Sequence, residues 1–169
     1  AAPIVQRHIE DHGVSFLLGD GVDSFEGNTA VLKSGKKVPF DLLVICVGVR
    51  PNTSLVSEAG GEVARGIRVD PGCATTIPDV YAAGDCTESF DVSSGQERIL
   101  ALLPNAYMQG RCAGTNMAGG EAVYDHAIPM NAIGFFGYHV LTAGTYTGEI
   151  YRSAEGCSLK KLFYENDRL

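Results

Sequence analysis

Short apolar runs and polar turns alternate along residues 3–40. Residues 3–12 have the apolar spacing of a helix, which Gly13 ends. Strand-like runs follow, separated by glycine-containing turns, at residues 14–18, 21–25, 29–32 and 37–40. This spacing predicts a helix followed by an antiparallel meander.

The next segment, Leu42–Val47, is apolar at every position. A continuous apolar run is typical of a strand buried on both faces, as in the centre of a parallel sheet. A second run of this kind, residues 80–83, predicts another buried strand, and a polar loop is expected over 88–98. The pattern therefore predicts an α/β fold, with a short helix over 52–59 and a short strand over 66–70.

The clearest helix is expected over residues 104–118, with Pro104 in its first turn and Gly119 and Gly120 at its end. Ala106, Gly110 and Gly114 lie four positions apart and form one stripe of small side chains. This stripe predicts close packing against a neighbour. From residue 123 the composition becomes aromatic and β-type, which predicts a strand-rich unit whose last strand enters a turn at 165–167.

Composition and charge exclude several classes of function. The 169 residues include 13 Lys and Arg against 20 Asp and Glu, a net charge of −7, without a basic cluster, so nucleic-acid and anionic-membrane binding are not expected. No apolar stretch approaches the roughly 20 residues of a membrane span, and the N-terminus does not resemble a signal peptide. The 5 cysteines show no CxxC and no zinc-ligand spacing, so no metal site is expected and a reduced, cytoplasmic setting is favoured.

Two motifs carry candidate chemistry. Gly48 follows the first buried strand and begins a Gly-x-x-Pro sequence, at the strand end where open α/β sheets bind ligands. The alternative is a core strand followed by an ordinary turn. In residues 75–85, a Thr-led stretch and a buried run end in Gly84 and Asp85, whose carboxylate can accept a hydrogen bond from a polyol hydroxyl. A helix-capping or loop carboxylate is the alternative there.

In this order, the two motifs resemble those of the flavin-dependent pyridine nucleotide oxidoreductases, which include NADH oxidases, coenzyme A-disulfide reductases and rubredoxin and nitrite reductase flavoproteins. GVRPNTSLVSEAG is similar to the family's crossover from the NAD domain to the FAD domain, and ATTIPDVYAAGDC to its second FAD motif. LLPNAYMQGRCAGTNMAGG resembles the helix that points at the flavin, and MNAIGFFGYHVLTAG the opening of the C-terminal interface domain. The resemblance covers nearly the whole chain.

The resemblance implies FAD and NAD(P)H as cofactors, with a hydride passing from NAD(P)H to FAD and electrons going on to a disulfide, oxygen or a small redox protein. It implies that Asp85 accepts a hydrogen bond from the FAD ribitol while Gly84 gives access, and that Gly48 lies near the FAD/NAD crossover. The helix start at Pro104, Asn105 and Ala106 would aim free N–H groups at the flavin pyrimidine carbonyl, which agrees with the partial positive charge of a helix N-terminus.

The implied architecture has three pieces: the latter half of an NAD(P)-binding domain at 1–50, a returning FAD-domain segment at 51–122, and the start of an α+β interface domain at 123–169 that forms a homodimer. The chain begins on a helix without a preceding strand and ends on a strand without a return, so we expect a fragment of a larger protein.

The sequence also departs from the family pattern. It contains no GxGxxG, although the family needs two such loops for its pyrophosphates. None of the cysteines matches the family's redox cysteine, and Cys86 has no nearby base or cation to activate it, so no catalytic residue is assigned. We therefore expect the fragment alone to be inactive. The alternative function is a non-catalytic folded module that oligomerises without a bound cofactor.

Overall fold

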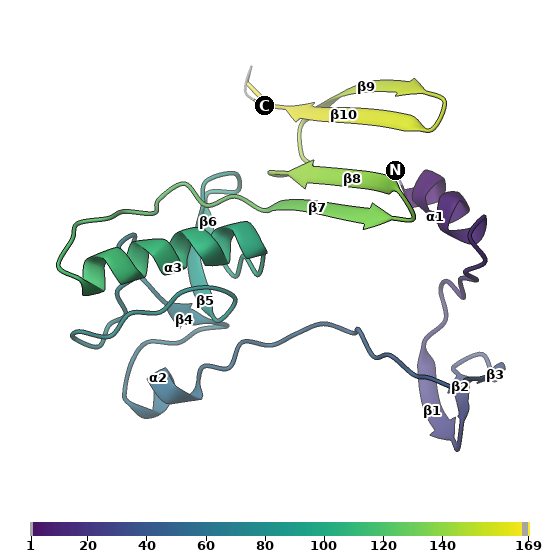
Figure 1. Ribbon diagram of the computed structural model, residues 1–169, viewed down its shortest axis with the longest axis horizontal. Helices are drawn as coiled ribbons and strands as arrows, with labels where there is room; N and C mark the ends of the chain where they lie inside the picture. The colour runs from purple at the N-terminus through teal and green to yellow at the C-terminus, as the bar shows by residue number, and fades with distance from the viewer. Residues whose placement is uncertain (1, 167–168) are drawn as a thin grey trace. The chain divides into compact units, whose positions relative to one another are not determined.

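The computed structural model describes residues 2–166 and 169 and divides the chain into two compact units, Ala1–Val49 and Arg50–Leu169 (Figure 1). The first unit begins with α1 (Ala2–Glu10). The helix ends shortly before Gly13, which has a φ of +86°. The strands of this unit are β1 (Val22–Glu26), β2 (Thr29–Leu32) and β3 (Lys37–Pro39). They pair antiparallel in the order β1-β2-β3, which confirms the predicted helix and the last three of the four predicted meander strands.

Two predicted strands of this unit are wrong. Residues 14–18 form no strand, and Leu42–Val47 has no strand assignment and lies in an exposed segment. Val44 is 71% exposed and Val47 is 91% exposed. A central parallel strand is stabilised by neighbours on both edges and cover on both faces. The described part of the chain supplies neither, so the apolar composition alone does not make this segment a buried strand.

The second unit combines a small mixed sheet with a long helix. Its elements up to the helix are α2 (Ser54–Glu58), β4 (Ile67–Arg68), β5 (Thr87–Asp91), β6 (Gln96–Arg98) and α3 (Leu103–Met117). β4 pairs parallel with β5, and β5 pairs antiparallel with β6. The predicted helices over 52–59 and 104–118 are confirmed.

Two corrections concern the segments on either side of β5. Residues 88–98, expected as a polar loop, contain most of the β5–β6 hairpin, because the Asp91 side chain and Gly95 close a tight turn. Residues 80–83, expected as a buried strand, are only partly buried or exposed, and Tyr81 makes just an isolated bridge to Ala74. This segment therefore runs beside the core without joining a sheet.

The core of the second unit lies against one face of α3. It contains Cys73, Leu100, Cys112, Ala113, Tyr124 and Ala127. The buried residues of α3 are Asn105, Gln109, Cys112 and Ala113. Gly110 and Gly114 are exposed, with no atom within 4 Å of a Cβ placed on either. The predicted packing of the small-residue stripe is therefore wrong among the described residues: each helix position is turned about 100° from the last, and Gly110 follows buried Gln109.

The C-terminal end of α3 is tied to two loops by Asn116. The Asn116 side-chain amide donates to the Gly72 carbonyl at 2.8 Å and to the Ala122 carbonyl at 2.9 Å. The Ala122 N–H donates back to Asn116 Oδ1 at 2.6 Å. One side chain thus joins the helix end to the loop that follows it and to the turn at Gly72, 44 residues earlier in the sequence.

Four strands follow α3, as the composition change at residue 123 predicts. They are β7 (Met130–Phe135), β8 (Tyr138–Ala143), β9 (Glu149–Glu155) and β10 (Ser158–Tyr164), paired as two separate antiparallel hairpins. β10 is itself the return strand of β9 through a turn at Gly156. The turn predicted at 165–167 extends to Asp167, which lies outside the described residues. No helix in the described part of the chain is long and apolar enough to cross a membrane.

Candidate functional site

The Gly84–Asp85 turn joins the extended residues 80–83 to β5. Gly84 has a φ of +87°, a left-handed conformation that glycine adopts at little cost. The Gly84 carbonyl accepts hydrogen bonds from the Thr87 N–H at 3.0 Å and from Thr87 Oγ1 at 2.8 Å. These two bonds close the turn between Gly84 and Thr87. Asp85 lies within the turn and is exposed.

Gln109 of α3 supports this turn from the buried side. Its Oε1 accepts from the Gly84 N–H at 2.7 Å and lies 3.0 Å from Thr87 Oγ1. Gln109 is 3% exposed and Thr87 is 2% exposed. Because both side chains are buried, these bonds are shielded from water. Gln109 belongs to no sequence motif, and the signal that could have found it is its position four residues after Asn105, on the same helix face.

The start of α3 lies next to the turn. A Cβ placed on Gly84 would be 3.5 Å from the Ala106 Cβ, an ordinary contact. Pro104 has no N–H, and the Ala106 N–H donates to the Leu102 carbonyl at 3.0 Å. Ala106 therefore does not present a free N–H, contrary to the sequence expectation. The Leu103 and Asn105 N–H groups remain without an acceptor in the described residues, and no acidic residue occupies the first turn.

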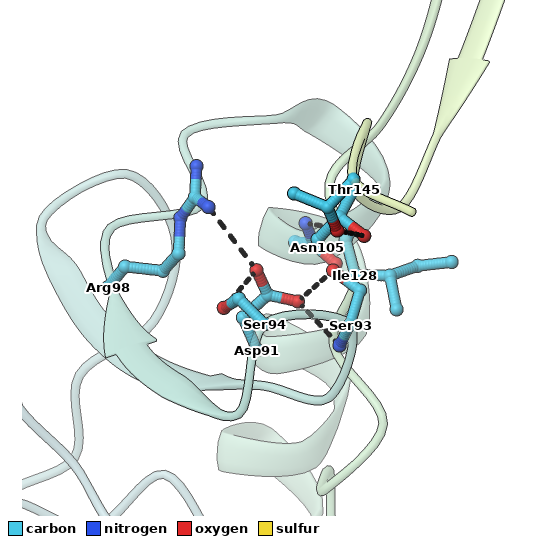
Figure 2. Close-up of polar contacts among 8 residues, drawn as sticks. Asp91, Ser93, Ser94, Arg98, Asn105, Ile128 and Thr145 are labelled. Carbon is cyan, nitrogen blue, oxygen red and sulfur yellow. Dashed lines mark hydrogen bonds and ion pairs between the residues drawn. The ribbon is translucent and has the colours of Figure 1, made fainter. Parts of the chain in front are cut away.

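The Asn105 side chain is buried and hydrogen-bonded within the protein. Its Nδ2 donates to the Ile128 carbonyl at 3.0 Å (Figure 2), and its Oδ1 accepts from the Tyr124 hydroxyl at 2.6 Å. Burial raises the pKa of Tyr124, and the nearby Cys73 adds to that rise. The Asn105 side chain thus fixes α3 to residues 124–128. The group of Asn105 that remains for a ligand is its backbone N–H.

The remaining predicted site residues differ in their surroundings. Asp85 is exposed, and its carboxylate has no hydrogen-bond partner within residues 2–166. Gly48 has a φ of +114° in the exposed segment that ends the first unit. The structure thus brings Gly84 and Ala106 together in the second unit, while Gly48 belongs to the other unit.

A buried carboxylate holds the neighbouring hairpin in shape (Figure 2). Asp91 is 0% exposed and accepts from the Ser93 N–H at 2.9 Å, Ser93 Oγ at 2.6 Å and Ser94 Oγ at 2.9 Å. Arg98 lies 3.4 Å from the same carboxylate. Burial alone would raise the pKa of Asp91, but the hydrogen bonds and Arg98 outweigh it and lower the pKa below its usual value.

A cavity of about 250 Å³ opens beside Leu102, the residue that precedes α3. Arg98 and residues of the β7–β8 hairpin line its other sides. Ligand pockets typically have volumes of roughly 300–1,000 Å³, so this cavity is small for a dinucleotide. No group of three metal-ligating side chains gathers within the described ranges.

Comparison with known proteins gives a consistent result. A family profile described as pyridine nucleotide-disulphide oxidoreductase matches residues 1–110. NADH-dependent phenylglyoxylate dehydrogenase subunit epsilon of Aromatoleum evansii is 33% identical over 176 residues, which cover 96% of this chain and 42% of the relative. NADH oxidase of Methanocaldococcus jannaschii is 35% identical over 127 residues, which cover 73% of this chain and 28% of the relative.

A solved structure has a similar fold. The NAD-dependent persulfide reductase from A. fulgidus matches with a TM-score of 0.82 and 30% identity, over 86% of this chain and 28% of that one. The α/β class expected from the sequence agrees with this likeness. The chain spans less than half the length of each of these three proteins.

Proposed function

We propose that this chain, which belongs to the pyridine nucleotide-disulphide oxidoreductase family, forms part of the flavin site of an NAD(P)H-dependent oxidoreductase. One observation carries the proposal: the Gly84–Asp85 turn is fixed by buried Gln109 directly beside the start of α3. A hydrogen-bond acceptor and a helix N-terminus with two free N–H groups are therefore held in one rigid region.

These residues fit a flavin with a polyol chain and an electron-accepting ring. Asp85 can accept a hydrogen bond from a ribitol hydroxyl. No hydrogen bond within residues 2–166 has to break first, because the exposed Asp85 carboxylate has no partner there. The Leu103 and Asn105 N–H groups, at the positive end of the helix dipole, stabilise negative charge on a ring carbonyl. When bound, FAD supplies the redox centre that takes a hydride from NAD(P)H and gives electrons to the acceptor. Because Gly84 has no side chain, the flavin can lie close to the backbone there.

The proposal extends to the domains, the oligomeric state, the electron acceptor and the location of the whole protein. Residues 1–50 and 51–122 belong to the NAD(P)- and FAD-binding domains, with Gly48 near their crossover. Residues 123–169 begin an interface domain, and homodimer formation is supported by apolar side chains exposed on its hairpins, such as Leu141 and Ile150. The acceptor is oxygen, a disulfide or a small redox protein, since relatives include NADH oxidases and a rubredoxin-NAD(+) reductase. A cytoplasmic location is supported by the free cysteines.

Asp85→Ala in the whole protein tests the flavin site. A lost hydrogen bond to a charged group costs roughly 1.5–3 kcal/mol, so we expect FAD to bind about 10- to 150-fold more weakly by titration of the apoprotein. Asp125→Ala, which removes the same charge from another exposed position, is the matched control and leaves binding unchanged. An unchanged FAD dissociation constant in Asp85→Ala would show that this carboxylate does not contact the flavin.

The isolated chain gives a second test. Because no GxGxxG lies in these residues, we expect NADH and FAD to show no turnover above free flavin when the chain is added. Turnover above that background refutes this expectation. A colourless preparation that also fails to bind added FAD favours the alternative of a folded module without a cofactor.

A further inference from the structure

Two free thiols lie together in the core of the second unit, outside the proposed flavin site. Cys73 is 2% exposed and Cys112 is 5% exposed, and neither is in a disulfide. Cys112 lies on the buried face of α3. Cys73 lies in the turn of residues 70–74, about 40 positions earlier in the sequence. The flavin proposal assigns a role to neither.

Cys112 contacts both the residue 70–74 turn and the loop after α3. The Cys112 thiol lies 3.6 Å from the Pro71 carbonyl and 3.4 Å from the Ala122 carbonyl. Cys73 and Cys112 both lie in the buried core cluster, together with Ala113 and Tyr124. Burial raises the pKa of Cys73 to about 12, and the charge and hydrogen bond of the adjacent Cys112 contribute to the rise. Cys73 and Cys112 thus belong to one small buried core, at the boundary between the turn and the helix.

The backbone at Cys73 is held in an uncommon conformation. Cys73 has a φ of +63°, in the left-handed region that residues other than glycine seldom adopt. Its N–H donates to the Asp70 carbonyl at 2.9 Å, and its carbonyl accepts from the Ala82 N–H at 3.1 Å. These bonds fix the residue from both sides and connect it to the extended segment that ends at Gly84.

We propose that Cys73 and Cys112 form a disulfide under oxidising conditions, as a modification site that links the residue 70–74 turn to the middle of α3. A peroxide is the oxidant: one thiolate attacks the O–O bond and becomes a sulfenic acid, with release of water. The second thiolate attacks that sulfur and expels the oxygen, which leaves as a second water. Two thiols and one hydrogen peroxide thus give one disulfide and two waters. This inference does not depend on the proposed flavin site.

The burial of the two thiols determines both the rate of their oxidation and its product. Few molecules carry a Cys73 thiolate at neutral pH, and covered thiols react slowly, so oxidation is slow in the native protein and faster at higher pH. Because both thiols are almost fully buried, a bulky adduct such as glutathione forms only when the core opens. Once one sulfur is oxidised, the neighbouring thiol is the nearest nucleophile, and the disulfide is the expected end product.

The experiment maps cysteines in the whole protein. The protein is treated with excess hydrogen peroxide, unfolded, alkylated and digested with trypsin together with a protease that cleaves before aspartate. Cleavage before Asp79 and Asp85 separates Cys73 from Cys86, which share one tryptic peptide. Mass spectrometry then detects a Cys73–Cys112 linked peptide pair that is lighter by two hydrogens than the separate peptides. Cys86→Ser is the matched control and keeps the link, whereas Cys112→Ala loses it.

The result expected is that this pair is the major linked product and that it disappears on treatment with dithiothreitol. The inference is overturned when Cys73 and Cys112 are both recovered alkylated although exposed Cys157 has been oxidised. It is also overturned when Cys73 is found linked to Cys86. Mapping of the unsubstituted protein decides the question even where Cys112→Ala does not fold.

Discussion

Gln109→Leu removes the acceptor that the Gly84 N–H and the Thr87 hydroxyl share. Leucine is close to glutamine in size, so the substitution takes away hydrogen bonding and leaves the packing of α3 nearly unchanged. The Thr87 hydroxyl keeps its bond to the Gly84 carbonyl at 2.8 Å. The Gly84 N–H, bound to Gln109 at 2.7 Å, has no such second partner within the described residues.

The magnitude follows from that one orphaned donor. Leaving a buried donor without an acceptor costs about 1–3 kcal/mol. The loss to Thr87 adds little, since its hydroxyl has a second acceptor. We therefore expect Gln109→Leu to lower the free energy of unfolding by about 1–3 kcal/mol, and the Gly84 amide hydrogen to exchange faster than in the unsubstituted protein.

Urea unfolding followed by circular dichroism measures the change, and hydrogen exchange followed by mass spectrometry locates it. Gln96→Leu makes the same substitution at an exposed position of β6, where a surface change stays within about 0.5 kcal/mol. If Gln109→Leu unfolds at the same urea concentration as Gln96→Leu, with unchanged exchange in residues 84–87, the turn does not depend on Gln109.

Three further predictions concern the stability of the second unit. Gly84→Ala forces a left-handed alanine and costs about 1–2 kcal/mol, whereas Gly110→Ala, exposed in the helix with open space around it, adds about 0.5–1 kcal/mol to stability; equal melting temperatures for the two variants would contradict this. Tyr124→Phe leaves Asn105 Oδ1 without its 2.6 Å donor and lowers the free energy of unfolding by about 1–3 kcal/mol in urea; no change would show that the bond is dispensable. Because the pKa of Asp91 is lowered in the folded state, its contribution is complete above the unfolded value of about 3.9 and is lost as the pH falls through the folded pKa. The urea midpoint should therefore fall more steeply below about pH 4 in the unsubstituted protein than in Asp91→Asn, and parallel curves would refute that assignment.

The elements that the sequence predicts correctly are those with local signals. Gly13 ends α1, short turns separate the strands of the meander, and Pro104 and Gly119 bound α3. In each case the residues that decide the structure lie within a few positions of the element. Local conformational preference and the final fold agree at these places.

The wrong predictions have two causes. In one case the structure depends on pairing with residues far away in the sequence, and in the other a polar side chain is buried, which its polarity does not suggest. Leu42–Val47 has the composition of a central strand, but strand pairing is non-local and no described strand pairs with it. On α3 the small stripe suggested the packed face, whereas polar Asn105 and Gln109 occupy it. A buried amide can be recognised only with its partners, here Ile128, Tyr124 and Gly84, which lie far from it in the sequence.

The three bonds of Asn116 have a consequence for how the second unit opens. The Ala122 N–H, at 2.6 Å from Asn116 Oδ1, is released only when the loop after α3 separates from the helix end. When the Asn116 side chain moves with that loop, it also releases the Gly72 carbonyl, which lies in the turn that carries Cys73. Amide exchange at Ala122 therefore reports a cooperative partial unfolding rather than fraying of a single loop. The hairpin of β9 and β10, with nearly all its side chains exposed, should lose its protection in a separate and earlier event.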